Sequence, residues 1–294
     1  MNSRLGVGFV LTLGRLIPPR IGYHLGGYLA GLLSRLKSAR IVRAVRSNQW
    51  VVSGRITDAI ALDDLTRQTF EHTAYCLYDL YHYMSNPQQI LSMVTLSDRL
   101  HKILREGSSA KQGTIFIAPH ISNFDLAGRA MALHNYRIQV LSYPEPPGGY
   151  QWQNKMRKDF GIDIIPMSTE SLRNAKKTLR DGGAILTGMD RPLENSNYHP
   201  LFFGYPAAVP VSYVRLGIMT DSPVVVVACH SIDRGKYMVD CSEPIKMIAN
   251  PDNTKEIEQN ARKALREAEK FIKMAPSQWS MFYPVWPWVL EKMP

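Results

Sequence analysis

Short apolar runs alternate with helical segments along most of the chain, and this alternation constrains the fold more than any other feature. The predicted strands lie at 114–119, 137–142, 162–166, 184–189, 224–229 and 236–241. The predicted helices lie at 125–133, 151–160, 170–180, 209–220 and 254–274, after a mostly helical region at 57–106. Strands that alternate with helices of this length predict an α/β fold. We therefore expect a central mixed, largely parallel sheet flanked by helices.

The N-terminal region has a different pattern. Two apolar stretches, Leu5 to Ile17 and Ile21 to Leu36, are separated by two prolines and followed by several arginines. Neither stretch is an uninterrupted apolar span of about twenty residues, the length that crosses a bilayer. We expect residues 1–46 to form membrane-associating helices whose basic side chains face lipid headgroups, and residues 47–294 to form the α/β domain. The alternative is that these helices pack on the domain.

Composition narrows the choice of partners. An apolar content of 45% is that of a folded protein with a core. The formal charge of +10 favours an anionic partner, such as an acidic membrane surface, a phosphate-bearing substrate or a nucleic acid. The three cysteines lack CxxC spacing, so we expect neither a disulfide framework nor a metal site.

One His and one Asp directly after the strand at 114–119 carry the predicted chemistry. His120 follows this strand, and Asp125 comes five positions later. We expect the Asp125 carboxylate to keep one ring nitrogen protonated, so that the other accepts a proton from a hydroxyl. His101 and Glu106 have the same spacing, but they lie in a polar amphipathic helix. The alternative for His120 is an ordinary loop histidine.

Further motifs follow His120 in a fixed order. They are Met189-Asp190-Arg191, Phe202 to Ala207, Arg215-Leu216-Gly217 and Ser222 to Val227. Over residues 5 to 290 the chain resembles the late acyltransferases of lipid A biosynthesis and the related phosphatidylinositol mannoside acyltransferases. The resemblance rests on the whole set of motifs, which is more specific than any one of them.

The resemblance implies transfer of a fatty acyl group from an acyl carrier protein or coenzyme A thioester. The acceptor is a hydroxyl of a membrane glycolipid or phospholipid, and no metal or redox cofactor is needed. His120 would be the general base and Asp125 its catalytic partner. Candidate substrate-binding residues are Asn123, Asp190, Arg191 and Arg215. Asp190 follows a predicted strand on the same sheet edge as His120, so we expect these two residues to approach each other across the site. The implied location is the cytoplasmic face of the inner (plasma) membrane, with the protein peripheral or N-terminally anchored.

The chain also departs from the family pattern. Phe124 stands where Trp is common, Pro192 replaces a frequent second acid, and residues 279–284 replace a basic run. These changes leave the acceptor lipid open. Three other functions are weighed against acyl transfer. They are a serine hydrolase using Ser122, for which no G-x-S-x-G motif is present, a nucleic-acid-binding protein, and a non-catalytic membrane-binding relative. We expect no nucleic-acid partner, because charge alone does not explain a His-x4-Asp block after a strand.

Overall fold

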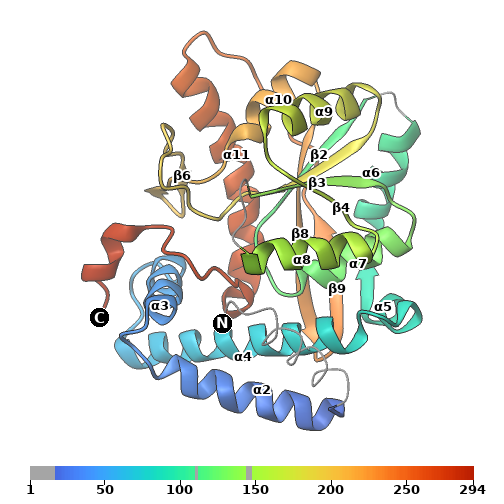
Figure 1. The fold of residues 1–294 in the computed structure, drawn as a ribbon. Coiled ribbons are helices and arrows are strands. Elements are labelled where there is room, and N and C mark those ends of the chain that lie inside the picture. The colour runs from blue at the N-terminus through green and yellow to red at the C-terminus, as the bar shows by residue number, and fades with distance from the viewer. Residues whose placement is uncertain (1–16, 110–111, 144–147) are drawn as a thin grey trace.

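A seven-stranded sheet forms the centre of the protein (Figure 1). The structure is a computed structural model that describes residues 17–109, 112–143 and 148–294. The strand order is β1-β9-β8-β2-β5-β3-β4. The strands are β1 (Val94–Leu96), β2 (Thr114–Ala118), β3 (Ile138–Ser142), β4 (Asp163–Pro166), β5 (Ala184–Gly188), β8 (Val224–Asp233) and β9 (Lys236–Cys241). β8 and β9 pair antiparallel, and the other pairs of this sheet are parallel. The predicted mixed, largely parallel sheet is confirmed.

Helices cover both faces of the sheet. Successive side chains of β2 point to opposite faces, so Ile115 and Ile117 belong to one apolar cluster and Phe116 to another. The cluster around Ile115 includes side chains of α9 (Thr169–Arg180), α10 (Ser212–Thr220) and α11 (Asn253–Met274). The cluster around Phe116 includes side chains of α4 (Ala59–Tyr83), α5 (Pro87–Met93), α6 (Asp98–Ser109), α7 (Phe124–Leu133) and α8 (Gly148–Asp159).

The region expected to be mostly helical, residues 57–106, contains one strand. β1 interrupts the helices and pairs in parallel with β9 at the edge of the sheet. Three residues are too short to show a period-two pattern, so only the pairing with β9 reveals this strand. The small antiparallel pair β6 (Leu201–Phe202) and β7 (Tyr205–Pro206) escaped prediction for the same reason.

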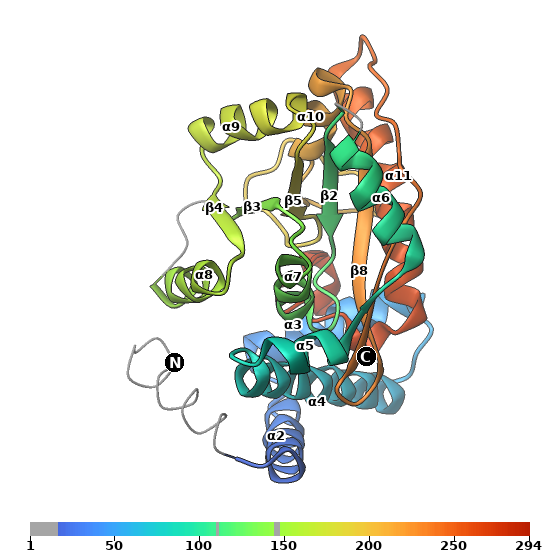
Figure 2. The same cartoon turned by 90° about the vertical axis from the view of Figure 1, so that its right-hand side faces the viewer.

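Two helices precede this domain in the described chain, α2 (Pro19–Ser34) and α3 (Arg40–Val52). α4 lies between α2 and the sheet (Figures 1 and 2). Gly22 permits this contact, because a Cβ there would lie 2.1 Å from the ring of Tyr78. None of the described helices is both long and apolar enough to cross a membrane. Nearly all of the stretch from Leu5 to Ile17 lies outside the described residues.

α3 is largely buried. Its side chains from Ala44 to Val52 pack inside the protein, and the expected boundary between residues 46 and 47 falls within this helix.

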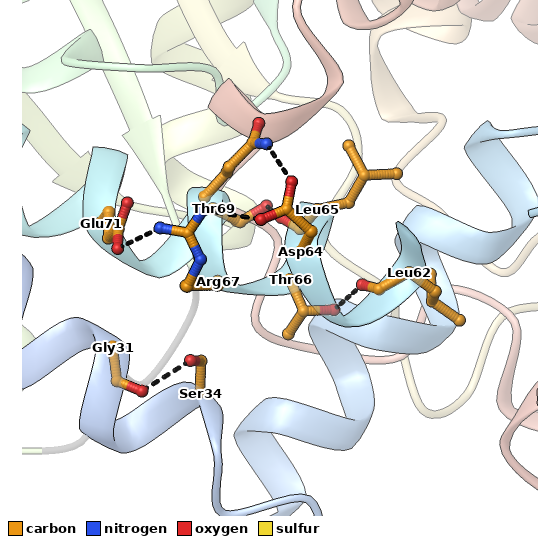
Figure 3. A network of polar contacts seen from close by, with 10 residues as sticks. Gly31, Ser34, Leu62, Asp64, Leu65, Thr66, Arg67, Thr69 and Glu71 are labelled. Atoms are coloured by element: carbon orange, nitrogen blue, oxygen red, sulfur yellow. Dashed lines mark hydrogen bonds and ion pairs between the residues drawn. The ribbon is translucent and has the colours of Figure 1, made fainter. Parts of the chain in front are cut away.

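α4 carries polar side chains where it is exposed to solvent. There Arg67 pairs with Asp64 and Glu71 at 2.6 Å each (Figure 3). Such exposed pairs contribute at most about 1 kcal/mol each. Burial of α3 and of the inner face of α4 therefore stabilises this layer more than surface charge does.

Asn48 on α3 fastens the C-terminal segment to the domain. Its amide nitrogen donates to the carbonyls of Met281 and Tyr283 at 3.0 and 2.8 Å, and its oxygen accepts from the Val285 amide at 3.0 Å. The side chain is 1% exposed. These three hydrogen bonds therefore satisfy backbone groups of residues 281–285 that would otherwise be buried without a partner.

We predict that Asn48→Ala lowers the free energy of unfolding by about 2–4 kcal/mol, because it leaves buried backbone groups unpaired. Denaturant unfolding followed by circular dichroism measures the effect. The matched control is Asn174→Ala on α9, where the side chain is exposed and little change is expected. Equal midpoints for the two variants would show that Asn48 does not hold the tail.

Candidate active site

The register between β2 and β5 brings His120 and Asp190 together. The two strands pair in parallel with Ala118 opposite Gly188, and each candidate residue follows two positions later. His120 Nδ1 donates to Asp190 Oδ1 at 2.6 Å, and the His120 backbone amide donates to Asp190 Oδ2 at 2.8 Å. The expectation that these two residues approach each other is confirmed. They lie at the carboxyl ends of parallel strands, where α/β folds place their sites.

The hydrogen bond to Asp190 decides the state of the imidazole. A carboxylate accepts hydrogen bonds, so Nδ1 carries a proton, and whenever the ring is uncharged Nε2 is the nitrogen that can accept one. The side chain of Asp190 has no exposed surface, whereas that of His120 is 25% exposed and lines a cavity. Gly188 leaves room for the ring, because a Cβ there would lie 3.2 Å from His120 Cε1. The hydrogen bond to Asp190 therefore fixes the ring, and its exposed part lines the cavity.

Asp125 does not contact His120 in this way, and the predicted role for its carboxylate is corrected. The carboxylate accepts from Arg157 Nε and Nη2 of α8 at 2.6 and 3.0 Å. Asp125 lies in the first turn of α7, and its side chain reaches α8 instead of the imidazole. The parallel register of β2 and β5 brings the Asp190 carboxylate within hydrogen-bond distance of the ring nitrogen. The five-residue spacing between His120 and Asp125 does not produce such a contact.

Asn123 belongs to the loop that joins His120 to α7. Its amide nitrogen donates to the Cys76 carbonyl at 2.9 Å, and its oxygen accepts from the Leu126 amide at 3.3 Å. The second bond caps the N-terminus of α7. The side chain is 3% exposed, so its polar groups serve the loop and the helix in this structure.

The two candidate arginines both line the cavity. The Arg191 guanidinium lies 4.3 Å from the ring centroid of Tyr283 and 4.5 Å from that of Tyr143, within the range of cation–π attraction. Arg215 donates to Tyr198 Oη at 3.1 Å and to Asn253 Oδ1 at 2.6 Å. Aromatic and polar side chains thus orient both guanidinium groups, and both arginines line the same cavity.

That cavity has a volume of about 1280 Å³ and reaches both faces of the sheet. On the α7 face much of its wall is apolar, and the Asp125–Arg157 pair lies beside the apolar residues. The lining residues there include Ala127, Met131, Ile138, Ile162 and Leu186. The neighbouring strand residues Gln139 and Thr187, which point to the opposite face, also line it, together with Asn195, Asn197 and Arg215. His120 therefore lines a space with one apolar and one polar part.

Ser122, the residue considered as a hydrolase nucleophile, is 4% exposed. Its hydroxyl lies 2.9 Å from His72 Nε2, and Cys76 Sγ lies 3.3 Å from the same nitrogen. Its backbone adopts the left-handed region, with φ at 51°. All three cysteines are free and buried. No group of three or more His, Cys, Asp or Glu in the described ranges could hold a metal ion.

Burial lowers the pKa of His72 to about 4, from an ordinary value of 6.5, with a smaller contribution from His230. The folded protein keeps this ring neutral, and the unfolded chain binds the proton more readily. We therefore predict that the free energy of unfolding falls as the pH decreases from about 6.5 to about 4. Denaturant unfolding at several pH values measures this slope.

A His72→Gln variant should show a shallower slope over that pH range, because it removes the titrating group. His199, which is exposed, provides the control His199→Gln, whose slope should match the wild type. An unchanged slope in His72→Gln would mean that other groups control acid unfolding.

Two residues of the site were not predicted in their observed roles. Arg157 neutralises Asp125, and Trp279 Nε1 donates to Asp190 Oδ2 at 2.7 Å. Arg157 lies 32 positions from Asp125, and Trp279 lies 89 positions from Asp190. Only the replacement of the expected basic run by residues 279–284 marked the second region as unusual.

Comparison with known proteins agrees with the resemblance seen in the motifs. Residues 3–287 match the family Bacterial lipid A biosynthesis acyltransferase. The chain belongs to this family. A phosphatidylinositol mannoside acyltransferase of Mycobacterium tuberculosis strain H37Rv is 24% identical over 131 residues, which cover 43% of this chain and 42% of the relative. The protein of the same name from strain CDC 1551 matches to the same extent. The chain thus spans less than half the length of these two curated relatives.

Proposed function

We propose that the protein is an O-acyltransferase that moves a fatty acyl group from an acyl thioester to a hydroxyl of a membrane glycolipid or phospholipid. The observation that carries the proposal is the His120–Asp190 hydrogen bond of 2.6 Å in the wall of a large, partly apolar cavity. Membership of the lipid A acyltransferase family supports it. The name of the mycobacterial relatives supports a lipid acceptor that carries sugar.

The reaction follows from the state of the ring. Nε2 of His120 removes the proton from the acceptor hydroxyl as the oxygen attacks the thioester carbonyl. The buried Asp190 carboxylate stabilises the imidazolium that forms. When the tetrahedral intermediate collapses, the carbon–sulfur bond breaks and the imidazolium returns its proton to the departing thiolate. The products are an ester and a free thiol, and the ring ends neutral.

The two parts of the cavity suit the two ends of such substrates. An acyl chain buried against Met131, Ile138 and Leu186 leaves water, and each buried methylene contributes about 0.8 kcal/mol. The side of Gln139 and Arg215 offers hydrogen-bond partners for a hydroxylated or phosphorylated headgroup. The acyl donor in this proposal is an acyl carrier protein or coenzyme A thioester, and the protein needs no further cofactor.

We further propose that the N-terminal region holds the protein on the cytoplasmic face of the inner membrane without requiring a spanning helix. One side of α2 is buried, and the other exposes a stripe of large apolar side chains. The stripe consists of Ile21, Leu25, Tyr28, Leu29, Leu32 and Leu33. Arg20 precedes it and Arg35 and Lys37 follow it. An apolar face bordered by cations is typical of helices that lie in the interface of an anionic bilayer.

The alternative functions receive less support. Ser122 is buried and is not part of the cavity wall, which argues against a serine nucleophile. A nucleic-acid-binding protein would account for the charge of +10 but not for the His120–Asp190 pair in a large, partly apolar cavity. A non-catalytic membrane protein would not require a free ring nitrogen facing that cavity.

We predict that His120→Ala lowers kcat by about 10²- to 10⁴-fold, because general-base catalysis is lost, while the melting temperature changes little. The assay measures transfer of labelled palmitate from its coenzyme A or carrier-protein thioester to total bacterial phospholipid and glycolipid. The control is His101→Ala, which should retain wild-type activity. Wild-type turnover in His120→Ala would refute the mechanism.

We also predict that the full-length protein binds vesicles that contain anionic phospholipid, as measured by cosedimentation. Replacing Leu25, Leu29 and Leu32 with Gln should weaken binding by at least about tenfold, since each leucine buries apolar area in the interface. The control replaces the exposed residues Ile232, Ile248 and Met274, which lie outside α2, with Gln. If both triple variants bind equally, α2 is not the membrane-docking face.

A further inference from the structure

The Asp190 carboxylate accepts hydrogen bonds at both oxygens. Oδ1 accepts from the His120 ring, whereas Oδ2 accepts from the His120 amide at 2.8 Å and from Trp279 Nε1 at 2.7 Å. A carboxylate with no exposed surface is costly unless its lone pairs are satisfied. The group could otherwise turn about its Cβ–Cγ bond. The two donors on Oδ2 therefore determine that Oδ1 points at the ring.

Trp279 is also fixed to the backbone that carries His120. Ile121 and Trp279 form an antiparallel bridge. On either side of it, the Ser280 amide donates to the His120 carbonyl and the Ser122 amide donates to the Gln278 carbonyl, each at 2.8 Å. The indole is 1% exposed, so water does not readily replace its N–H. Its position relative to Asp190 is thus set by the same short pairing that sets the position of His120.

We propose that Trp279 is a positioning residue: its indole N–H holds the Asp190 carboxylate so that Oδ1 keeps Nδ1 of His120 protonated and Nε2 open to the cavity. This inference rests on the proposed function, because it concerns His120 as the base. Trp279 does not line the cavity and acts through Asp190 alone. Its contribution lies in the hydrogen bond from Nε1 to Asp190 Oδ2, and suitable variants can test this bond separately from the packing of the indole ring.

Trp286 provides a matched control for the packing. Its ring lies 6.3 Å from that of Trp279, and it is likewise 1% exposed. Both rings pack against Phe202, at 6.0 Å for Trp279 and 5.5 Å for Trp286. The indole nitrogen of Trp286, however, is buried and has no hydrogen-bond partner in the part of the chain that the structure describes. Replacing Trp286 with Phe therefore removes ring volume without removing a hydrogen bond.

The first measurement compares Trp279→Phe with Trp286→Phe in the acyl-transfer assay. We expect Trp279→Phe to lower kcat by about 10- to 100-fold, the size of effect found when outer partners of metal-binding histidines are removed, with KM nearly unchanged. Trp286→Phe should remain within about threefold of the wild type, because the hydrogen bonds of Asp190 are kept. Equal losses of kcat in the two variants would assign Trp279 to packing and overturn the proposal.

The second measurement does not depend on enzyme activity. Nitrogen NMR of isotope-labelled histidine distinguishes the two neutral tautomers of the ring, and a His120→Gln variant assigns the His120 signals. The wild type and Trp286→Phe should show the Nδ1–H form, and Trp279→Phe should show a mixture. An unchanged Nδ1–H form in Trp279→Phe overturns the proposal. A tautomer shift in a protein that transfers no acyl group supports the positioning role and rejects the proposed function.

A Trp279→Phe protein that does not fold would leave the hydrogen bond untested, so a second variant keeps the ring shape. Site-specific replacement of Trp279 by benzothienylalanine exchanges the N–H for sulfur with little change in volume. We expect this variant to fold and to show the same loss of kcat and the same tautomer mixture. Wild-type kcat together with a pure Nδ1–H form would overturn the inference.

Discussion

The buried hydrogen bonds of Asp190 depend on three parts of the chain at once. The pairing of β2 with β5 sets the distance between His120 and Asp190, and the C-terminal segment supplies the indole of Trp279. Asn48 on α3 holds that segment in place through residues 281–285. An ionised carboxylate without these donors would be expensive to bury. The candidate base therefore takes its orientation from the assembled domain and not from its own loop.

The two carboxylates near His120 have separate roles because their surroundings differ. Asp190 is enclosed by N–H donors and touches the ring, whereas Asp125 forms a bidentate pair with Arg157 and so joins α7 to α8. Both helices contribute to the cavity wall, through residues such as Gly128 and Tyr150. Loss of the Asp125–Arg157 pair would leave an uncompensated charge at this wall. Asp125, the acid of the His-x4-Asp block, thus shapes the cavity next to the candidate base.

The N-terminal helices connect the proposed chemistry to the proposed location. α3 is packed into the domain, whereas α2 rests on α4 and leaves its apolar stripe uncovered in the described structure. α4 in turn supplies His72 and Cys76, which contact Ser122 in the loop after His120. The surface proposed to meet the membrane is therefore separated from the loop that carries His120 by a single helix, α4. This arrangement suits an enzyme whose acceptor is a lipid.

The sequence by itself determined the order of the elements and singled out His120 as the candidate base. The apolar runs predicted six strands of the sheet to within a few residues, because buried parallel strands need continuous apolar side chains. His120 and Asp190 each directly follow such a run. They were expected at the same edge because the carboxyl ends of parallel strands lie together there. Single-sequence patterns could not find β1, β6 or β7, which are two or three residues long and exist only through their pairing.

Only the tertiary structure decided which carboxylate serves His120. Proximity along the chain favoured Asp125, but hydrogen bonding requires proximity in space, which the register of β2 and β5 gives to Asp190. The same holds for Trp279 and Arg157, whose partners lie 89 and 32 positions away. Local sequence fixes periodicity and capping, because these depend on neighbours within a few residues. The hydrogen-bond partners of a buried charge, by contrast, come from any segment that the fold places next to it.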